Sequence, residues 1–126
     1  MAAPKDLKYS KTHEWVKFQD DGTALTGFAD YAQDALGDLV FMNAPAEGDI
    51  VAAGEPYGDI ESVKAVSDIY SPVTGVILEV NEDVVDDPAK INADPYGAWL
   101  IKIGEITARG DLLEPDAYDQ LCEQEA

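Results

Sequence analysis

One lysine stands apart from the other basic residues of this chain. Lys64 is the only basic residue between Lys17 and Lys90, and it lies in the segment Glu-Ser-Val-Lys-Ala-Val-Ser-Asp, residues 61–68, between two strand-like stretches. A lysine at a hairpin turn projects its primary amine on a long, flexible stem. Such an amine can be acylated and can then carry the attached group as a swinging arm. The alternative is an ordinary exposed lysine with acidic neighbours, and composition alone favours it because most lysines are simply exposed.

Residues for conventional catalysis are scarce. His13 is the only histidine and Cys122 the only cysteine, and nothing in the sequence places them side by side as a base and a nucleophile. One residue of each type gives no ligand spacing for a metal, and no glycine-rich phosphate-binding motif is present. We therefore expect no independent active site and no metal site, and we interpret His13 as a partly buried histidine at a strand end.

The charge balance limits the partners. Eight basic side chains against 26 acidic ones give a formal charge of −18. This charge opposes binding to phosphate backbones and to anionic membranes, so neither nucleic acid nor membrane is an expected partner. A solvated, monomeric surface is one interpretation of the acidity, and steering toward basic partner proteins is the other.

Length and segment composition predict one domain without a membrane span. The 126 residues suffice for a single packed core, expected from residue 6 to about residue 120 and followed by an acidic tail. The longest uncharged stretch, residues 69–78, is half of the roughly 20 residues that a spanning helix needs. The first ten residues resemble neither a secretory signal nor a transit peptide. We expect a cytoplasmic protein, or a protein of the mitochondrial matrix if the chain is a processed eukaryotic one.

Lys64 and the other candidate residues must be positioned by short apolar stretches, which are separated by glycine, proline and acidic residues. Residues 13–18 and 23–28 flank the turn sequence Asp-Asp-Gly and predict a hairpin. Further strands are expected at residues 39–42, 50–53, 57–60, 69–70, 73–80 and 99–103. This spacing is typical of an antiparallel sandwich or barrel, so we predict a mainly β fold.

Helices are expected in three places. In the first, Asp30 is the predicted N-cap, with Gln33 at capping-box spacing and Gly37 as the left-handed residue after the last turn. Its residues Ala32, Ala35 and Leu36 should face inward. Residues 88–92 predict a helical turn, and residues 114–123 predict a terminal helix with Tyr118, Leu121 and Cys122 on one face.

The same segments resemble, in order, those of the glycine cleavage H protein family. The likeness covers residues 7 to about 120, and its main blocks are residues 9–16, 30–41, 58–75, 79–82, 91–92 and 95–97. The Glu-Ser-Val-Lys-Ala sequence differs from the Met-Lys-Met setting of biotinylated lysines and from the Asp-Lys-Ala setting of lipoyl domains in 2-oxoacid dehydrogenases. The chain departs from the family at residues 96–99 and 104–111, where the connections look shorter than usual.

This resemblance implies a barrel-sandwich hybrid of two small antiparallel sheets with peripheral short helices. Lys64 would lie on an exposed turn as the only lipoylated residue, carrying lipoate as N6-lipoyllysine. The chain would be a non-catalytic carrier, because its chemistry would belong to the cofactor. We expect the whole chain, residues 1–126, to form this single lipoyl-carrier domain.

The resemblance also implies a set of partners. A pyridoxal-phosphate glycine decarboxylase would load the aminomethyl group of glycine, and a tetrahydrofolate-dependent aminomethyltransferase would remove it with release of ammonia. Dihydrolipoyl dehydrogenase, with FAD and NAD, would reoxidise the carrier, and a lipoyl-attaching enzyme would modify Lys64. Three alternatives stay open: a lipoyl-relay protein that supplies other enzymes, an H-like carrier outside glycine catabolism, and an acidic β domain with an unmodified Lys64.

A loaded arm poses a chemical problem, because an aminomethyl group on sulfur tends to lose ammonia in water. Folding the arm against the protein would exclude water, and the protonated amine would then need acceptors. Glu14, beside His13 and Trp15, and Asp68, four residues after Lys64, are the candidate carboxylates. The alternative is that both are ordinary solvated acids.

Overall fold

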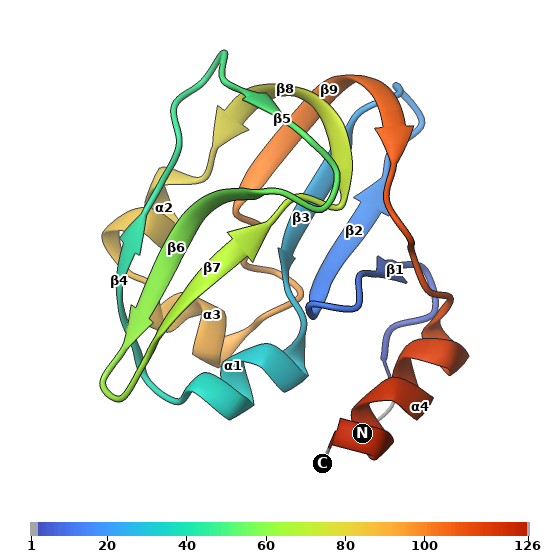
Figure 1. Ribbon diagram of the computed structural model, residues 1–126. Helices are drawn as coiled ribbons and strands as arrows, with labels where there is room; N and C mark the ends of the chain where they lie inside the picture. Colours follow the sequence, from blue (N-terminus) through green and yellow to red (C-terminus); the bar gives the residue numbers. More distant parts are fainter. Residues whose placement is uncertain (1–2, 126) are drawn as a thin grey trace.

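A computed structural model describes residues 3–125, and it shows two antiparallel sheets with short helices at their margins (Figure 1). The larger sheet has the strand order β1 (Lys8–Tyr9), β2 (Glu14–Phe18), β3 (Ala24–Phe28), β9 (Ile101–Arg109), β8 (Val73–Val80) and β5 (Ile50–Val51). The smaller sheet has the order β4 (Leu39–Asn43), β6 (Pro56–Ser62) and β7 (Val66–Tyr70). The predicted mainly β fold of two antiparallel sheets is confirmed, and neither sheet closes into a barrel.

The first predicted hairpin is formed by β2 and β3. Its register runs from Glu14 opposite Phe28 to Phe18 opposite Ala24. At the turn, Gly22 has φ 86°, a value that glycine adopts without steric strain, and the Thr23 N–H donates to Asp21 Oδ1 at 3.0 Å. The hairpin is confirmed, with each strand starting one residue later than predicted.

Helices fill the space around the smaller sheet. α1 (Asp30–Leu36), α2 (Glu82–Asp86) and α3 (Ala89–Ala93) each add a buried residue to the core that covers the inner face of this sheet. The core consists of Phe28, Ala32, Leu39, Met42, Ile60, Ile69, Val84, Ile91, Ala98 and Leu100. A second core, with Val51, Val73, Ile77, Val80, Ile101 and Ile103, lies under β5, β8 and β9. In residues 3–125 no helix is long and apolar enough to cross a membrane.

The first helix differs in detail from the prediction. Ala29 occupies the N-cap and Asp30 is already helical, so the predicted cap at Asp30 is wrong. The Asp30 carboxylate instead accepts from Gln33 Nε2 at 2.8 Å, a side-chain pair within the helix. Ala32 is buried and Leu36 is half-buried against the same core, as predicted, but Ala35 is exposed, because it lies on the side of this short helix that faces solvent.

The last strand and the last helix also have different bounds. β9 starts at Ile101, not at residue 99, and continues to Arg109 because its second half pairs with Val73 and Thr74. Residues 104–109 are therefore strand rather than a short connection. The terminal helix is confirmed as α4 (Pro115–Glu125), in which Tyr118 is buried and Leu121 and Cys122 are half-buried. The short strand β1 and the helix α2 were not predicted.

Gly75 is a position where the close pairing of β8 and β9 excludes a side chain. A Cβ atom there would lie 2.5 Å from the Gly104 carbonyl oxygen and 2.7 Å from Ile103 Cγ2. We expect Gly75→Ala to lower the free energy of unfolding by about 3 kcal/mol in urea titrations, because backbone must move to make room. Gly110→Ala is the control: its Cβ would meet no atom closer than 3.3 Å. An equal loss in both variants would contradict this reading of the β8–β9 contact.

Candidate functional site

Lys64 lies at the tip of the hairpin between β6 and β7. The tip is held by Ser62, whose Oγ accepts from the Lys64 N–H at 3.3 Å and from the Ala65 N–H at 3.0 Å. The Ser62 N–H donates in turn to the Ala65 carbonyl oxygen at 2.8 Å. Lys64 itself is exposed. The predicted hairpin position of this lysine is confirmed.

The stem of Lys64 lies against the end of α1. A Cβ atom at Gly37 would be 3.6 Å from Lys64 Cε, and in Figure 1 the hairpin tip reaches down beside the end of α1. Asn92 on α3 fixes this connection, because its Nδ2 donates to the Gly37 carbonyl oxygen at 3.0 Å and its Oδ1 accepts from the Leu39 N–H at 3.0 Å. The flexible Lys64 side chain thus lies against a connection between α1 and β4 that Asn92 holds in place.

The Lys64 amine is free for acylation. Within residues 3–125 it takes part in none of the ion pairs, all of which join residues 5–13 to residues 114–125. An exposed, unpaired primary amine on a tight turn is accessible to an enzyme that would acylate it. No cluster of three His, Cys, Asp or Glu side chains placed to hold a metal exists in the described part of the chain.

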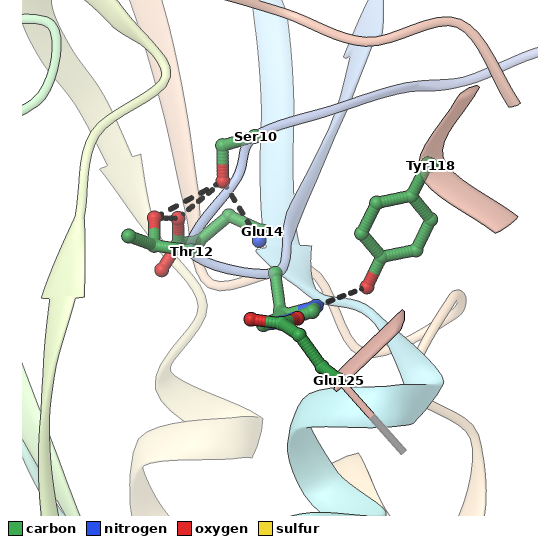
Figure 2. A network of polar contacts seen from close by, with 6 residues as sticks. Ser10, Thr12, Glu14, Tyr118 and Glu125 are labelled. Carbon is green, nitrogen blue, oxygen red and sulfur yellow. Dashed lines mark hydrogen bonds and ion pairs between the residues drawn. The ribbon is translucent and has the colours of Figure 1, made fainter. Parts of the chain in front are cut away.

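Glu14 is the one fully buried carboxylate among the described residues, with only 1% of its surface exposed. Its Oε1 accepts from Ser10 Oγ at 2.5 Å and from Thr12 Oγ1, and its Oε2 accepts from the Tyr70 N–H at 3.4 Å. Figure 2 shows the two hydroxyl groups directed at the carboxylate from the loop before β2. Tyr70 is the last residue of β7, so Glu14 joins the larger sheet to the smaller one.

The site around Glu14 has spare hydrogen-bonding capacity. Burial raises the pKa of Glu14 from its ordinary 4.5 to about 7, although the bonds from Ser10 and Thr12 oppose the shift. Burial likewise raises the pKa of Tyr57 well above 10, with a further contribution from the nearby Glu14 carboxylate. Tyr57 Oη is the one buried side-chain polar atom in residues 3–125 without a hydrogen-bond partner. A carboxyl group and a free hydroxyl group thus lie near one another in the interior.

The raised pKa of Glu14 predicts a pH-dependent stability. Between pH 4.5 and about 7 the folded protein keeps a proton on Glu14 that the unfolded chain has lost, so stability falls as the pH rises through this window. In the wild type, the free energy of unfolding should fall by up to about 3 kcal/mol between pH 4.5 and pH 8, and in Glu14→Gln this fall should be absent, because glutamine stays neutral. Urea titrations of both proteins at these two pH values measure the free energies of unfolding. A difference in stability that does not change with pH would contradict the prediction.

The loop that carries Ser10 and Thr12 is held in place by contacts of His13 with the C-terminal helix α4. His13 has φ 70°, its Nδ1 lies 2.7 Å from Tyr118 Oη, and its Nε2 lies 2.6 Å from Glu125 Oε2. Its ring stacks on Tyr31 of α1, with centroids 4.5 Å apart. The prediction of a partly buried histidine at a strand end is confirmed. Figure 2 shows Tyr118 and Glu125 of α4 on the side of this loop away from Ser10 and Thr12.

Asp68 has a different environment from Glu14. It is exposed on β7 and lies opposite Asp59, whose Oδ1 accepts from Asn43 Nδ2 at 2.7 Å. It is not among the hydrogen-bond partners of Glu14, although it precedes Tyr70 by two residues on the same strand.

The sequence interpretation missed Ser10, Thr12 and Tyr57. Two hydroxyl residues shortly before an acid were the available signal for the first two, and nothing local pointed to Tyr57.

Comparisons with known proteins agree on one family. The sequence profile described as Glycine cleavage H-protein matches residues 7–125. A glycine cleavage system H protein of Lachnoclostridium phytofermentans is 53% identical, over 99% of this chain and 98% of the relative. The chain belongs to the glycine cleavage H-protein family. Another such protein, from Carboxydothermus hydrogenoformans, is 48% identical over 97% of this chain and 95% of the relative.

A solved structure of the family has the same fold. The crystal structure of a glycine cleavage system H protein from Mycobacterium marinum matches with a TM-score of 0.90 and 42% identity, covering 98% of this chain and all of the other. The resemblance read from the sequence is therefore confirmed. The family is a non-catalytic, lipoyl-carrying subunit of the glycine cleavage system, and this chain is such a shuttle protein rather than an enzyme.

Proposed function

We propose that this chain carries its lipoyl group on Lys64, in an amide bond to Nζ, and that residues 1–126 act together as one carrier domain. The observation that carries the proposal is the exposed, unpaired amine at the tip of the β6–β7 hairpin. Ser62 and the end of α1 hold the turn without enclosing the amine. A group attached there is presented to other proteins while the fold stays rigid.

The attached group supplies redox-active sulfur chemistry, with which the carrier accepts the aminomethyl group of glycine. The protein contributes placement and protection. Its partners in the proposal are the pyridoxal-phosphate glycine decarboxylase, the tetrahydrofolate-dependent aminomethyltransferase and dihydrolipoyl dehydrogenase, together with a lipoyl-attaching enzyme. The names of the relatives support this role over a lipoyl relay or a carrier outside glycine catabolism.

We further propose that Glu14 receives the protonated amine of the loaded arm, with Asp68 as a second carboxylate on the way. β7 starts two residues after Lys64 and ends at Tyr70, which bonds Glu14, so the strand covers about 13 Å between the two sites. Asp68 lies midway along it. The free Tyr57 hydroxyl and the buried Glu14 carboxyl offer acceptors for a cation taken out of water.

We place the protein in the cytoplasm. The relatives compared are bacterial, which supports this part of the sequence prediction and gives no support to the mitochondrial alternative. The acidic surface, with its formal charge of −18, fits a monomer that meets its partners transiently.

Intact-mass measurement of the protein from its native source tests the proposal directly. We expect the mass of the chain plus one lipoyl group, and peptide mapping should locate that group at Lys64. Adding this protein to the three partner enzymes should restore glycine-dependent NADH formation. A natively isolated protein that carries no lipoyl group, or carries it on another lysine, would contradict the proposal.

A further inference from the structure

A short turn before β2 connects the buried carboxylate of Glu14 to the C-terminal helix. Ser10 and Thr12 of this turn donate their hydroxyl hydrogens to Glu14 Oε1. His13, which lies between Thr12 and Glu14 in the sequence, instead directs its ring nitrogens at α4. One turn, residues 10–13, thus carries both the donors to Glu14 and an attachment to a helix more than 100 residues away.

The backbone of this turn is closed at His13. The His13 N–H donates to the Ser10 carbonyl oxygen at 3.2 Å, and the Glu14 N–H donates to Ser10 Oγ at 3.0 Å. His13 has φ 70°, a left-handed conformation that is unfavourable for a residue with a side chain. The conformation persists because contacts of the His13 side chain offset this strain.

The His13 ring is held from both sides. Its Nδ1 lies 2.7 Å from Tyr118 Oη and its Nε2 lies 2.6 Å from Glu125 Oε2, and we call these two contacts the His13 clasp. A neutral imidazole satisfies both, because Nε2–H donates to the carboxylate while Nδ1 accepts from the phenol. The ring also stacks on Tyr31 of α1, and Tyr118 stacks on Tyr9 with centroids 4.4 Å apart. The clasp therefore fixes the turn to two helices.

The two oxygens of Glu14 have different numbers of partners. Oε1 accepts from both Ser10 and Thr12, whereas among the described residues Oε2 accepts only from the Tyr70 N–H, at the long distance of 3.4 Å. A carboxylate oxygen can accept two hydrogen bonds, so Oε2 has room for another donor. This oxygen lies on the side of β7, and rotation of the carboxylate would break the two hydroxyl bonds. The turn thus keeps the less occupied oxygen directed toward β7.

We propose that His13 is a positioning residue for the loaded carrier: its clasp holds the turn 10–13 so that Glu14 keeps Oε2 free for the protonated amine of the arm. This inference rests on the proposed function, in which Glu14 receives that amine. His13 acts through Ser10 and Thr12, because its own ring nitrogens are both occupied by α4. The C-terminal helix therefore helps to determine how long the loaded group survives in water.

His13→Asn tests the inference, because asparagine tolerates a positive φ but cannot form the clasp. In unmodified full-length protein, the Glu14 N–H, which bonds Ser10 Oγ, should exchange with solvent at least about threefold faster by NMR. In lipoylated protein loaded with the aminomethyl group at pH 8, ammonia should be released at least about threefold faster. Tyr118→Phe, which keeps the ring stacked on Tyr9 but lacks the hydroxyl group, should change both rates in the same direction.

Lys8→Gln is the matched control. It removes the ion pair between Lys8 Nζ and Glu114 Oε1, 2.5 Å apart, which ties β1 to the residue before α4 without touching the clasp. This variant should change neither the amide exchange of Glu14 nor the release of ammonia. The comparison separates the clasp from the general attachment of α4 to the fold.

A double-variant cycle separates positioning from general stabilisation. On the Glu14→Gln background, His13→Asn should cause no further increase in ammonia release, because no carboxylate charge remains to be positioned. An equal increase on this background would overturn the inference, since His13 would then act on the whole fold. Wild-type amide exchange and wild-type ammonia release in folded His13→Asn would also overturn it, and if that variant does not fold, the same two rates in Tyr118→Phe decide. Ammonia release from Glu14→Gln at the wild-type rate would instead contradict the assignment of Glu14 itself.

Discussion

Lys64→Arg is expected to abolish lipoyl attachment and, with it, all carrier activity. Arginine keeps the positive charge, but its guanidinium stays protonated at any accessible pH and does not act as an acyl acceptor. The free energy of unfolding should change by less than about 0.5 kcal/mol, because position 64 is exposed and its side chain takes part in none of the described ion pairs. Intact mass, glycine-dependent NADH formation and urea titration measure the three effects.

Lys17→Arg provides the matched control, because Lys17 is also an exposed lysine on the β framework, on β2. This variant should accept one lipoyl group and support full turnover. If the Lys64→Arg protein gains the mass of a lipoyl group, or turns over glycine normally, then another lysine carries the arm and the assignment is wrong.

Glu14→Gln is expected to speed the loss of ammonia from the loaded carrier at least about tenfold. At pH 8, above the raised pKa of about 7, Glu14 is charged. Glutamine keeps the size of the side chain and an acceptor oxygen but removes the charge that pairs with the cationic amine, and a hydrogen bond to a charged group contributes about 1.5 kcal/mol or more. The measurement uses isolated, lipoylated protein loaded with the aminomethyl group, in the absence of the aminomethyltransferase, with ammonia followed over time.

Asp68→Asn separates the two candidate carboxylates in the same assay. We expect a smaller effect than at Glu14, because Asp68 is exposed and water screens its interaction with the amine. Equal rates of ammonia release from the wild type and both variants would show that neither carboxylate protects the amine. A larger effect at Asp68 would mean that the arm stops at the outer face of β7 and does not reach the interior.

Local sequence patterns predicted most strands of the fold. The Asp-Asp-Gly turn between two alternating stretches was enough to predict the β2–β3 hairpin, because turn chemistry and strand alternation act over a few residues. The position of Lys64 at a turn could be predicted for the same reason. Its proposed role as the lipoyl acceptor came from the resemblance to the family, since the local sequence pattern alone does not distinguish an acceptor lysine from any other exposed hairpin lysine.

Predictions failed where the outcome depended on neighbours distant in the chain. β9 extends past residue 103 because Val73 and Thr74 of β8 continue the pairing, and sequence alone gives no view of that partner. The α1 residue Ala35 is exposed although Ala32 and Leu36 of the same helix pack against the core, because the side that the helix turns to solvent is set by the distant residues on which it packs. The bulge at Val40 likewise depends on the register between β4 and β6.

The sequence by itself determined the antiparallel β class, the hairpin lysine, the acidic surface and the family. Only the tertiary structure decided which of the many carboxylates is buried and has a raised pKa. Glu14 is buried because Tyr70, 56 residues away, and Tyr57 come from the smaller sheet to enclose it, and His13 beside it is held by Tyr118, 105 residues away. Burial and pKa depend on everything packed around a group, whereas turn and strand signals depend on adjacent residues. An acid in this acidic chain therefore acquires its distinct chemistry only when the two sheets and α4 come together.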